Sequence, residues 1–187
     1  MVQELKNIND IYLNLFYENK LNIMKFIEND FINTYNFDDY CVNLRIIKLL
    51  SEESSSILEI NSFYNLPSIS LLAGNPKKLI KISNNISFNY YELINYINDI
   101  ELLIYEDFNK KLNSINFDFL YINNFNYDNN IYLYDKIFNN VKINKYIMID
   151  GIDDYFLMKL KSLIERYNWK VYSINKTKFN FVILKRI

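Results

Sequence analysis

The chain has 187 residues, of which half are hydrophobic and 17% aromatic, so a single folded domain is expected rather than a disordered segment. It contains no histidine and one cysteine, which excludes histidine-based nucleophile systems, histidine metal ligands, cysteine zinc sites and an intrachain disulfide. The formal net charge of -1 demands no polyanionic partner, and the two glycines, Gly74 and Gly151, allow few phosphate-binding loops.

The first fifty residues are expected to form helices that cap the rest of the chain. Apolar residues recur at helical spacing from Ile8 to Phe16 and from Ile23 to Phe31. A third stripe is expected at Val42, Ile46, Leu49 and Leu50, ending in a polar loop over residues 51–56. We interpret residues 1–50 as an N-terminal helical cap and residues 57–187 as the main part of one compact domain.

After this loop, short apolar strands alternate with helices. We expect strands at 57–60, 78–82, 101–105, 117–122 and 145–149, and helices at 66–74, 90–97, 108–115, 129–138 and 153–167. Asp153 or Asp154 would cap the last helix, and a strand pair at 169–174 and 179–184 closes the chain around a tight turn. This order predicts an α/β fold: a mainly parallel sheet with helices on both faces and an antiparallel C-terminal hairpin.

Three segments at strand ends carry a recognisable pattern. Residues 57–68 (ILEINSFYNLPS) place Glu59 before a turn, residues 117–127 (FDFLYINNFNY) surround the end of the fourth strand, and residues 145–150 (KYIMID) end the fifth strand in an acid. Together with the element order, they resemble the class I S-adenosylmethionine (SAM)-dependent methyltransferases, in particular the macrocin and catechol O-methyltransferase types. The resemblance implies a Rossmann-like sheet of seven strands from about Ile57 to the C-terminus.

The resemblance also implies a cofactor site at named positions. Glu59 matches the acid of the first motif, Asp107 the adenine position after the third strand, and Asp150 the acid that ends the fifth strand. The remaining positions depart from the family: Asn61 and Asn65 replace glycines around Ser62, Ser83 replaces the ribose-binding acid, and Asn123 replaces the acid after the fourth strand. Asparagine tolerates left-handed φ, but its side chain would project toward the cofactor.

These acids also have structural interpretations. Glu59 could bond amides of its own turn, and Asp107 could cap the helix expected from Phe108. Asp150 is the candidate catalytic residue; alone it would form a poor magnesium site, so no metal is expected.

Three functions are therefore weighed. The first is a methyltransferase-fold protein with a degenerate SAM site, acting as a binding or subunit-stabilising module. The second is an active, divergent SAM-dependent O-methyltransferase, and the third a module associated with RNA processing. The N-terminal helices could offer an apolar face to a protein partner. The basic C-terminal end could contact RNA or simply form a solvated hairpin face, and comprises Lys170, Lys176, Lys178, Lys185 and Arg186.

Composition also bears on origin and location. Asn, Ile, Lys, Tyr and Phe are abundant, which is typical of an A/T-rich genome such as that of a giant virus, a protist or an intracellular organism. The first residues lack the basic start and apolar segment of a secretory signal, and no apolar run reaches the roughly 18 residues of a membrane span. We expect a soluble protein that is cytoplasmic or otherwise intracellular.

Overall fold

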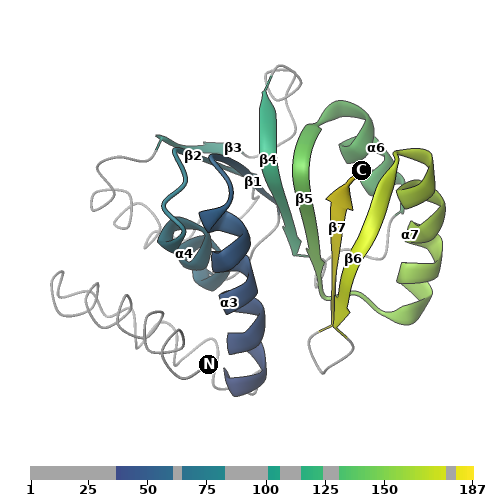
Figure 1. The fold of residues 1–187 in the computed structure, drawn as a ribbon, viewed down its shortest axis with the longest axis horizontal. Helices are drawn as coiled ribbons and strands as arrows, with labels where there is room; N and C mark the ends of the chain where they lie inside the picture. The colour runs from purple at the N-terminus through teal and green to yellow at the C-terminus, as the bar shows by residue number, and fades with distance from the viewer. Residues whose placement is uncertain (1–36, 61–64, 83–100, 106–114, 124–130, 176–179) are drawn as a thin grey trace, which may run out of the picture.

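Parallel strands and a C-terminal hairpin form one sheet in the middle of the molecule (Figure 1). The computed structural model of the protein describes residues 37–60, 65–82, 101–105, 115–123, 131–175 and 180–187. The strand order is β3-β2-β1-β4-β5-β7-β6; strands β1 to β5 are parallel to one another, and β7 pairs antiparallel with both β5 and β6. The expected mainly parallel α/β sheet with an antiparallel C-terminal hairpin is confirmed.

The element bounds follow the chain in the expected alternation. The elements are α3 (Phe37–Glu52), β1 (Ser56–Ile60), α4 (Asn65–Ala73), β2 (Lys78–Ile82), β3 (Glu101–Tyr105), β4 (Asn116–Asn123), α6 (Ile131–Asn140), β5 (Lys142–Asp150), α7 (Asp154–Arg166), β6 (Trp169–Asn175) and β7 (Phe181–Arg186). The two helices expected before residue 37 and the helix at 90–97 lie outside the described residues, as does the helix at 108–115 except for Ile115, which directly precedes β4.

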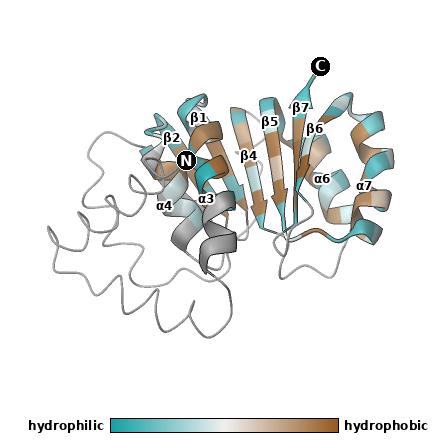
Figure 2. Cartoon of the chain, turned by 60° about the horizontal axis from the view of Figure 1, so that its bottom comes forward, coloured by the Kyte–Doolittle hydropathy of each residue, from teal (hydrophilic) through white to brown (hydrophobic). Residues whose placement is uncertain are grey.

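One face of the sheet is almost entirely apolar. Side chains of the central strands pack there against α6 and α7, and this cluster includes Leu58, Ile60, Ile122, Ile149, Tyr134 and Phe156. Figure 2 shows these strands as hydrophobic between the two pairs of helices. Burial of each large apolar side chain stabilises the fold by about 1.5–3 kcal/mol, so this face provides the main core.

The opposite face mixes polar residues with apolar ones. Because successive residues of a strand point to opposite faces, Glu59, Lys81 and Tyr121 lie on the side away from α6 and α7. Glu59 and Lys81 bond Ser68 of α4, and Asp150 on the same face bonds Asn43 of α3, which places those two helices over this face. A buried polar face needs specific partners, and α3 and α4 supply them.

Helix α3 buries a different stripe from the one expected. Ile46 is partly exposed and Leu49 is 40% exposed, and the helix continues to Glu52, into the segment expected as a loop. Of the expected residues Leu50 is buried, and the residues buried beside it are Asn43, Leu44, Ile47 and Ser51. Two of them are polar: Asn43 bonds Asp150, and the Ser51 hydroxyl donates to the carbonyl of Leu71. A search for apolar periodicity alone could not find a face that includes these polar anchors.

Asparagine takes the place of glycine at two helix ends. Asn75 follows α4 with φ of 56°, and Asn168 follows α7 with φ of 55°, both in the left-handed region. The Asn75 N–H bonds the carbonyl of Leu72, and the Asn168 N–H that of Glu165, as in a helix C-cap. At these two sites the glycine-poor chain uses the next best residue for a left-handed turn.

Candidate functional site

Three of the expected site residues lie on neighbouring strands at one edge of the sheet. Strands β1, β4 and β5 are adjacent and parallel, with Ile60 beside Ile122 and Asn123 beside Asp150. Glu59, Asn123 and Asp150 therefore stand at the carboxyl ends of three successive strands. Open α/β sheets bind their ligands outside these ends, which makes this edge the candidate site.

Glu59 belongs to a buried group of charged and polar side chains. It lies next to Lys81 in the register of β1 and β2, and neither side chain is more than 3% exposed. The Lys81 ammonium is 3.4 Å from Glu59 Oε1 and donates to Ser68 Oγ at 2.7 Å. Ser68, in α4, donates its hydroxyl to the same Glu59 oxygen at 2.6 Å. The three side chains thus connect β1, β2 and α4.

Burial and charge act in opposite directions on Lys81. Removal from water lowers the pKa of the Lys81 ammonium, while the Glu59 carboxylate beside it raises that pKa less strongly. An ion pair in such surroundings depends on both members, because removal of one leaves the other buried without its counter-charge. Glu59 and Lys81 are therefore energetically coupled.

Lys81 was not among the residues expected at the site. The strand Lys78–Ile82 reads as a mostly apolar segment, and a lysine inside it suggests an exposed position. One feature of the sequence could have revealed this pairing. If the two parallel strands are aligned at their carboxyl ends, Ile60 lies beside Ile82 and Glu59 beside Lys81. Opposite charges at such a cross-strand position favour each other.

Asp150 is the second buried acid at this edge. Its side chain is fully buried, and each carboxylate oxygen accepts hydrogen bonds. Oδ1 accepts from Asn43 Nδ2 at 2.8 Å and from the Gly151 N–H at 3.1 Å, and Oδ2 accepts from the Tyr121 hydroxyl at 3.1 Å. Asp150 thereby ties α3 to β4 and β5 across the polar face.

Burial dominates the protonation of Asp150. Loss of water raises the pKa of its carboxyl to about 7, although the hydrogen bonds from Tyr121, Gly151 and Asn43 lower it. A carboxyl with such a pKa can both hold and release a proton near neutrality, which is the property a general base needs. Its complete burial keeps it from direct contact with a substrate in this conformation.

The remaining expected residues contribute less to the described edge. Asn65 is the first residue of α4, and the Asn123 side chain is 1% exposed. Asn61, Ser62, Ser83 and Asp107 lie outside the described residues. Within the described ranges, no three residues among His, Cys, Asp and Glu are grouped as a metal ion would require. No described helix is long and apolar enough to cross a membrane.

Comparison with known proteins identifies the fold. No protein-family model and no curated protein sequence matches the chain. Solved structures do match: a SAH-bound methyltransferase of Podospora anserina has a TM-score of 0.57, with 12% identity over 83% of each chain. An O-methyltransferase of Bacillus cereus in complex with SAH has a TM-score of 0.53, with 13% identity over 78% of this chain and 81% of the other.

A third structure agrees with these two. A ribosomal protein methylase of Lactobacillus delbrueckii subsp. bulgaricus has a TM-score of 0.56, with 13% identity over 77% of this chain and 79% of the other. The chain therefore has the fold of the SAM-dependent methyltransferases, as its motifs led us to expect. At these identities the likeness establishes the fold, and function has to be argued from the site.

Proposed function

We propose that this chain is a methyltransferase-fold protein with a degenerate SAM site, and that it acts as a binding or subunit-stabilising module. The observation that carries the proposal is the contact between Glu59 and Lys81. The first-motif acid, which the resemblance assigns to the cofactor, is bonded by Ser68 and paired with a lysine inside the protein.

The energetics of this pair disfavour a cofactor role for Glu59. If Glu59 turned toward SAM, Lys81 would stay buried without its counter-charge, at a cost of about 3–5 kcal/mol. A penalty of that size weakens an affinity by a factor of roughly 10² to 5 × 10³. SAM also carries a positively charged sulfonium, which the Lys81 ammonium would repel.

The sequence adds further substitutions at the same pocket. Asn61 and Asn65 stand in place of the two motif glycines, and Ser83 in place of the ribose-binding acid. One change could be compensated, whereas several changes in one pocket are hard to combine with tight binding. Together with the Glu59–Lys81 pair, they support a module whose contribution is its surface rather than methyl transfer.

Calorimetric titration of the full chain with SAM and with SAH tests the proposal. We expect no saturable binding up to millimolar ligand, and no ligand-induced rise in melting temperature. Micromolar binding of either compound would overturn the degenerate site. In that event Glu59→Gln, compared with the exposed Glu165→Gln as a matched control, shows whether the ligand occupies the first-motif position.

The alternative function is an active, divergent O-methyltransferase, and Asp150 is the observation in its favour. A carboxyl with a pKa of about 7 at the ligand edge has the protonation behaviour of a general base. Under this alternative, SAM binds and Asp150→Asn abolishes methyl transfer while leaving SAM affinity unchanged. The same titration therefore separates the two functions.

The subunit-stabilising role predicts a partner on the N-terminal side of the molecule. Leu49 is an exposed apolar residue of α3, which is the described helix of the N-terminal cap expected to meet a partner. Capture of a partner from the native source should be lost with Leu49→Asp. It should persist with Val171→Asp in β6, because Val171 has nearly the same exposure, 39% against 40%. Equal capture by both variants would contradict a partner site at α3.

A further inference from the structure

A second pocket lies at the opposite end of the strands from the candidate cofactor site. It has a volume of about 490 Å³ and is lined by the beginnings of β4, β5 and β6 and by the final residues of α6, α7 and β7. Three of its lining residues are cationic, Lys142, Arg166 and Arg186, and four are asparagines. None of the described residues that line it is an aspartate or a glutamate.

Arg186 is held in place at this pocket by two contacts. Its guanidinium carbon lies 5.1 Å from the centre of the Trp169 ring, and its Nη1 donates to the carbonyl of Tyr167 at 3.2 Å. A guanidinium has five N–H donors, so an arginine fixed in this way still has donors for a ligand. Two parallel N–H groups of a guanidinium can donate to two oxygens of one phosphate or carboxylate.

Helix ends account for part of the positive charge. The carbonyl ends of α6 and α7 meet at this pocket and favour nearby cations, and Arg186 bonds one of these carbonyls. Arg166 pairs with Asp135 at 2.9 Å. Lys142, however, forms no ion pair or hydrogen bond through its side chain with the described part of the protein. Its charge and the remaining donors of Arg186 are therefore available to a ligand.

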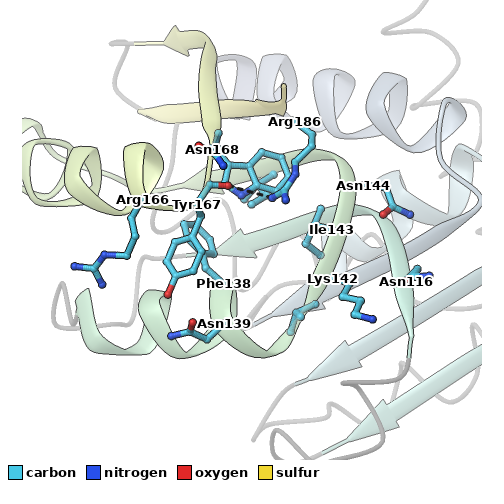
Figure 3. A pocket seen from close by; sticks show the side chains of 13 residues that line it. Asn116, Phe138, Asn139, Lys142, Ile143, Asn144, Arg166, Tyr167, Asn168 and Arg186 are labelled. Atoms are coloured by element: carbon cyan, nitrogen blue, oxygen red, sulfur yellow. Dashed lines mark hydrogen bonds between the residues drawn. The ribbon is translucent and has the colours of Figure 1, made fainter.

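The pocket also offers aromatic surface. Phe138 and Tyr167 pack edge to face with ring centres 5.7 Å apart, and both line the pocket. Figure 3 shows these two rings with Arg166 on one side and Lys142 on the other. Cationic and amide donors beside aromatic rings are the groups that bind nucleotides: the donors meet the phosphate, and the rings meet the planar base.

We infer that this pocket binds the phosphate and base of a nucleotide, either a free mononucleotide or one nucleotide of a single-stranded RNA. Arg186 and Lys142 contact the phosphate, and Tyr167 supports the base. The site lies at the other edge of the sheet from Glu59 and Asp150, so it does not depend on whether SAM binds. Both sources of the nucleotide share the same chemistry, and the experiment below distinguishes them.

The test uses uracil-containing probes, because they do not resemble the adenosyl group of SAM. Binding of UMP, uridine and a single-stranded oligo(U) RNA to the full chain is measured by calorimetry at low salt. We expect UMP or the oligonucleotide to bind saturably, uridine to bind far more weakly, and the affinity to fall with added salt. UMP binding identifies a mononucleotide site, whereas binding of the oligonucleotide alone identifies RNA as the source.

Variants locate the binding. Lys142→Gln should weaken it about fivefold, as expected for loss of one exposed charge contact, without changing the fold. Lys77→Gln removes another exposed lysine, one that does not line the pocket, and should leave the affinity unchanged. The inference is wrong if neither UMP nor the oligonucleotide binds, if uridine binds as tightly as UMP, or if the two variants have the same effect.

Discussion

The buried Asp150 predicts an unusual dependence of stability on pH. A carboxyl whose pKa rises from 3.8 in the unfolded chain to about 7 in the folded protein keeps its proton in the folded state, where the unfolded chain has lost it. The folded state then binds more protons between these two values, so the free energy of unfolding must fall as the pH rises from about 4 to about 7. About one pH unit above 7 the carboxyl is ionised in both states, and this contribution no longer changes.

The size of the effect follows from the shift. Each pKa unit corresponds to 1.36 kcal/mol, so the full contribution is about 4 kcal/mol, of which about 2.5 kcal/mol lies between pH 5 and pH 8. Asp150→Asn removes the titrating group and keeps the hydrogen bonds of the site. The amide oxygen of the new side chain can accept from Asn43 and Gly151, and its NH₂ group can donate to the Tyr121 hydroxyl, because a hydroxyl accepts as well as donates.

Urea unfolding followed by circular dichroism at pH 5, 6, 7 and 8 measures the effect. The difference in unfolding free energy between Asp150→Asn and the native chain should change by about 2.5 kcal/mol in favour of the variant over this range. Asp154→Asn, an exposed acid in the first turn of α7, controls for the loss of a carboxylate as such. A difference for Asp150→Asn that stays constant within about 0.5 kcal/mol would refute the raised pKa.

Further predictions concern the buried ion pair and the two helix ends. Glu59→Leu or Lys81→Met alone should lower the free energy of unfolding, measured with urea, by about 3–5 kcal/mol. The double variant should have nearly the stability of the native chain, and a double variant that loses the sum of the two single losses would contradict the coupling. Gly74→Ala should cost about 1–3 kcal/mol in the same assay, because a Cβ there would lie 2.8 Å from the backbone nitrogen of Glu52; an unchanged stability would show that α3 and α4 can separate freely. Asn168→Gly should raise the melting temperature by about 2 °C, since glycine adopts the left-handed φ of 55° without strain; a lower melting temperature would contradict this account.

The sequence predicted the sheet because strand signals and topology rules agree along the chain. Short apolar segments such as Leu79–Ile80 and Ile147–Ile149 identify buried parallel strands, and the helical stripe of α7 predicts a helix capped by Asp153, whose Oδ1 accepts from the Phe156 N–H at 2.6 Å. Connection lengths then decide between parallel and antiparallel pairing. These features depend on residues near one another in sequence.

Contacts between distant residues account for what the sequence did not predict. Asn43 and Asp150 are 107 positions apart, so the polar stripe of α3 could not be recognised before the fold was known. Lys81 resembles a surface residue until its register with Glu59 is known. Both cases concern buried polar groups, whose partners are specified by the tertiary structure rather than by local pattern.

The two buried polar groups suggest how this face of the sheet works under the proposed function. Glu59, Ser68 and Lys81 join α4 to β1 and β2, and Asn43 and Asp150 join α3 to β5. Hydrogen-bonded buried groups specify one arrangement, because any shift leaves donors or acceptors without partners. If SAM does not bind, the acids that the resemblance assigns to a cofactor serve instead to hold two helices in fixed positions. A rigid outer surface on α3 and α4 is what a subunit-stabilising module would need, and the Leu49→Asp experiment examines that surface directly.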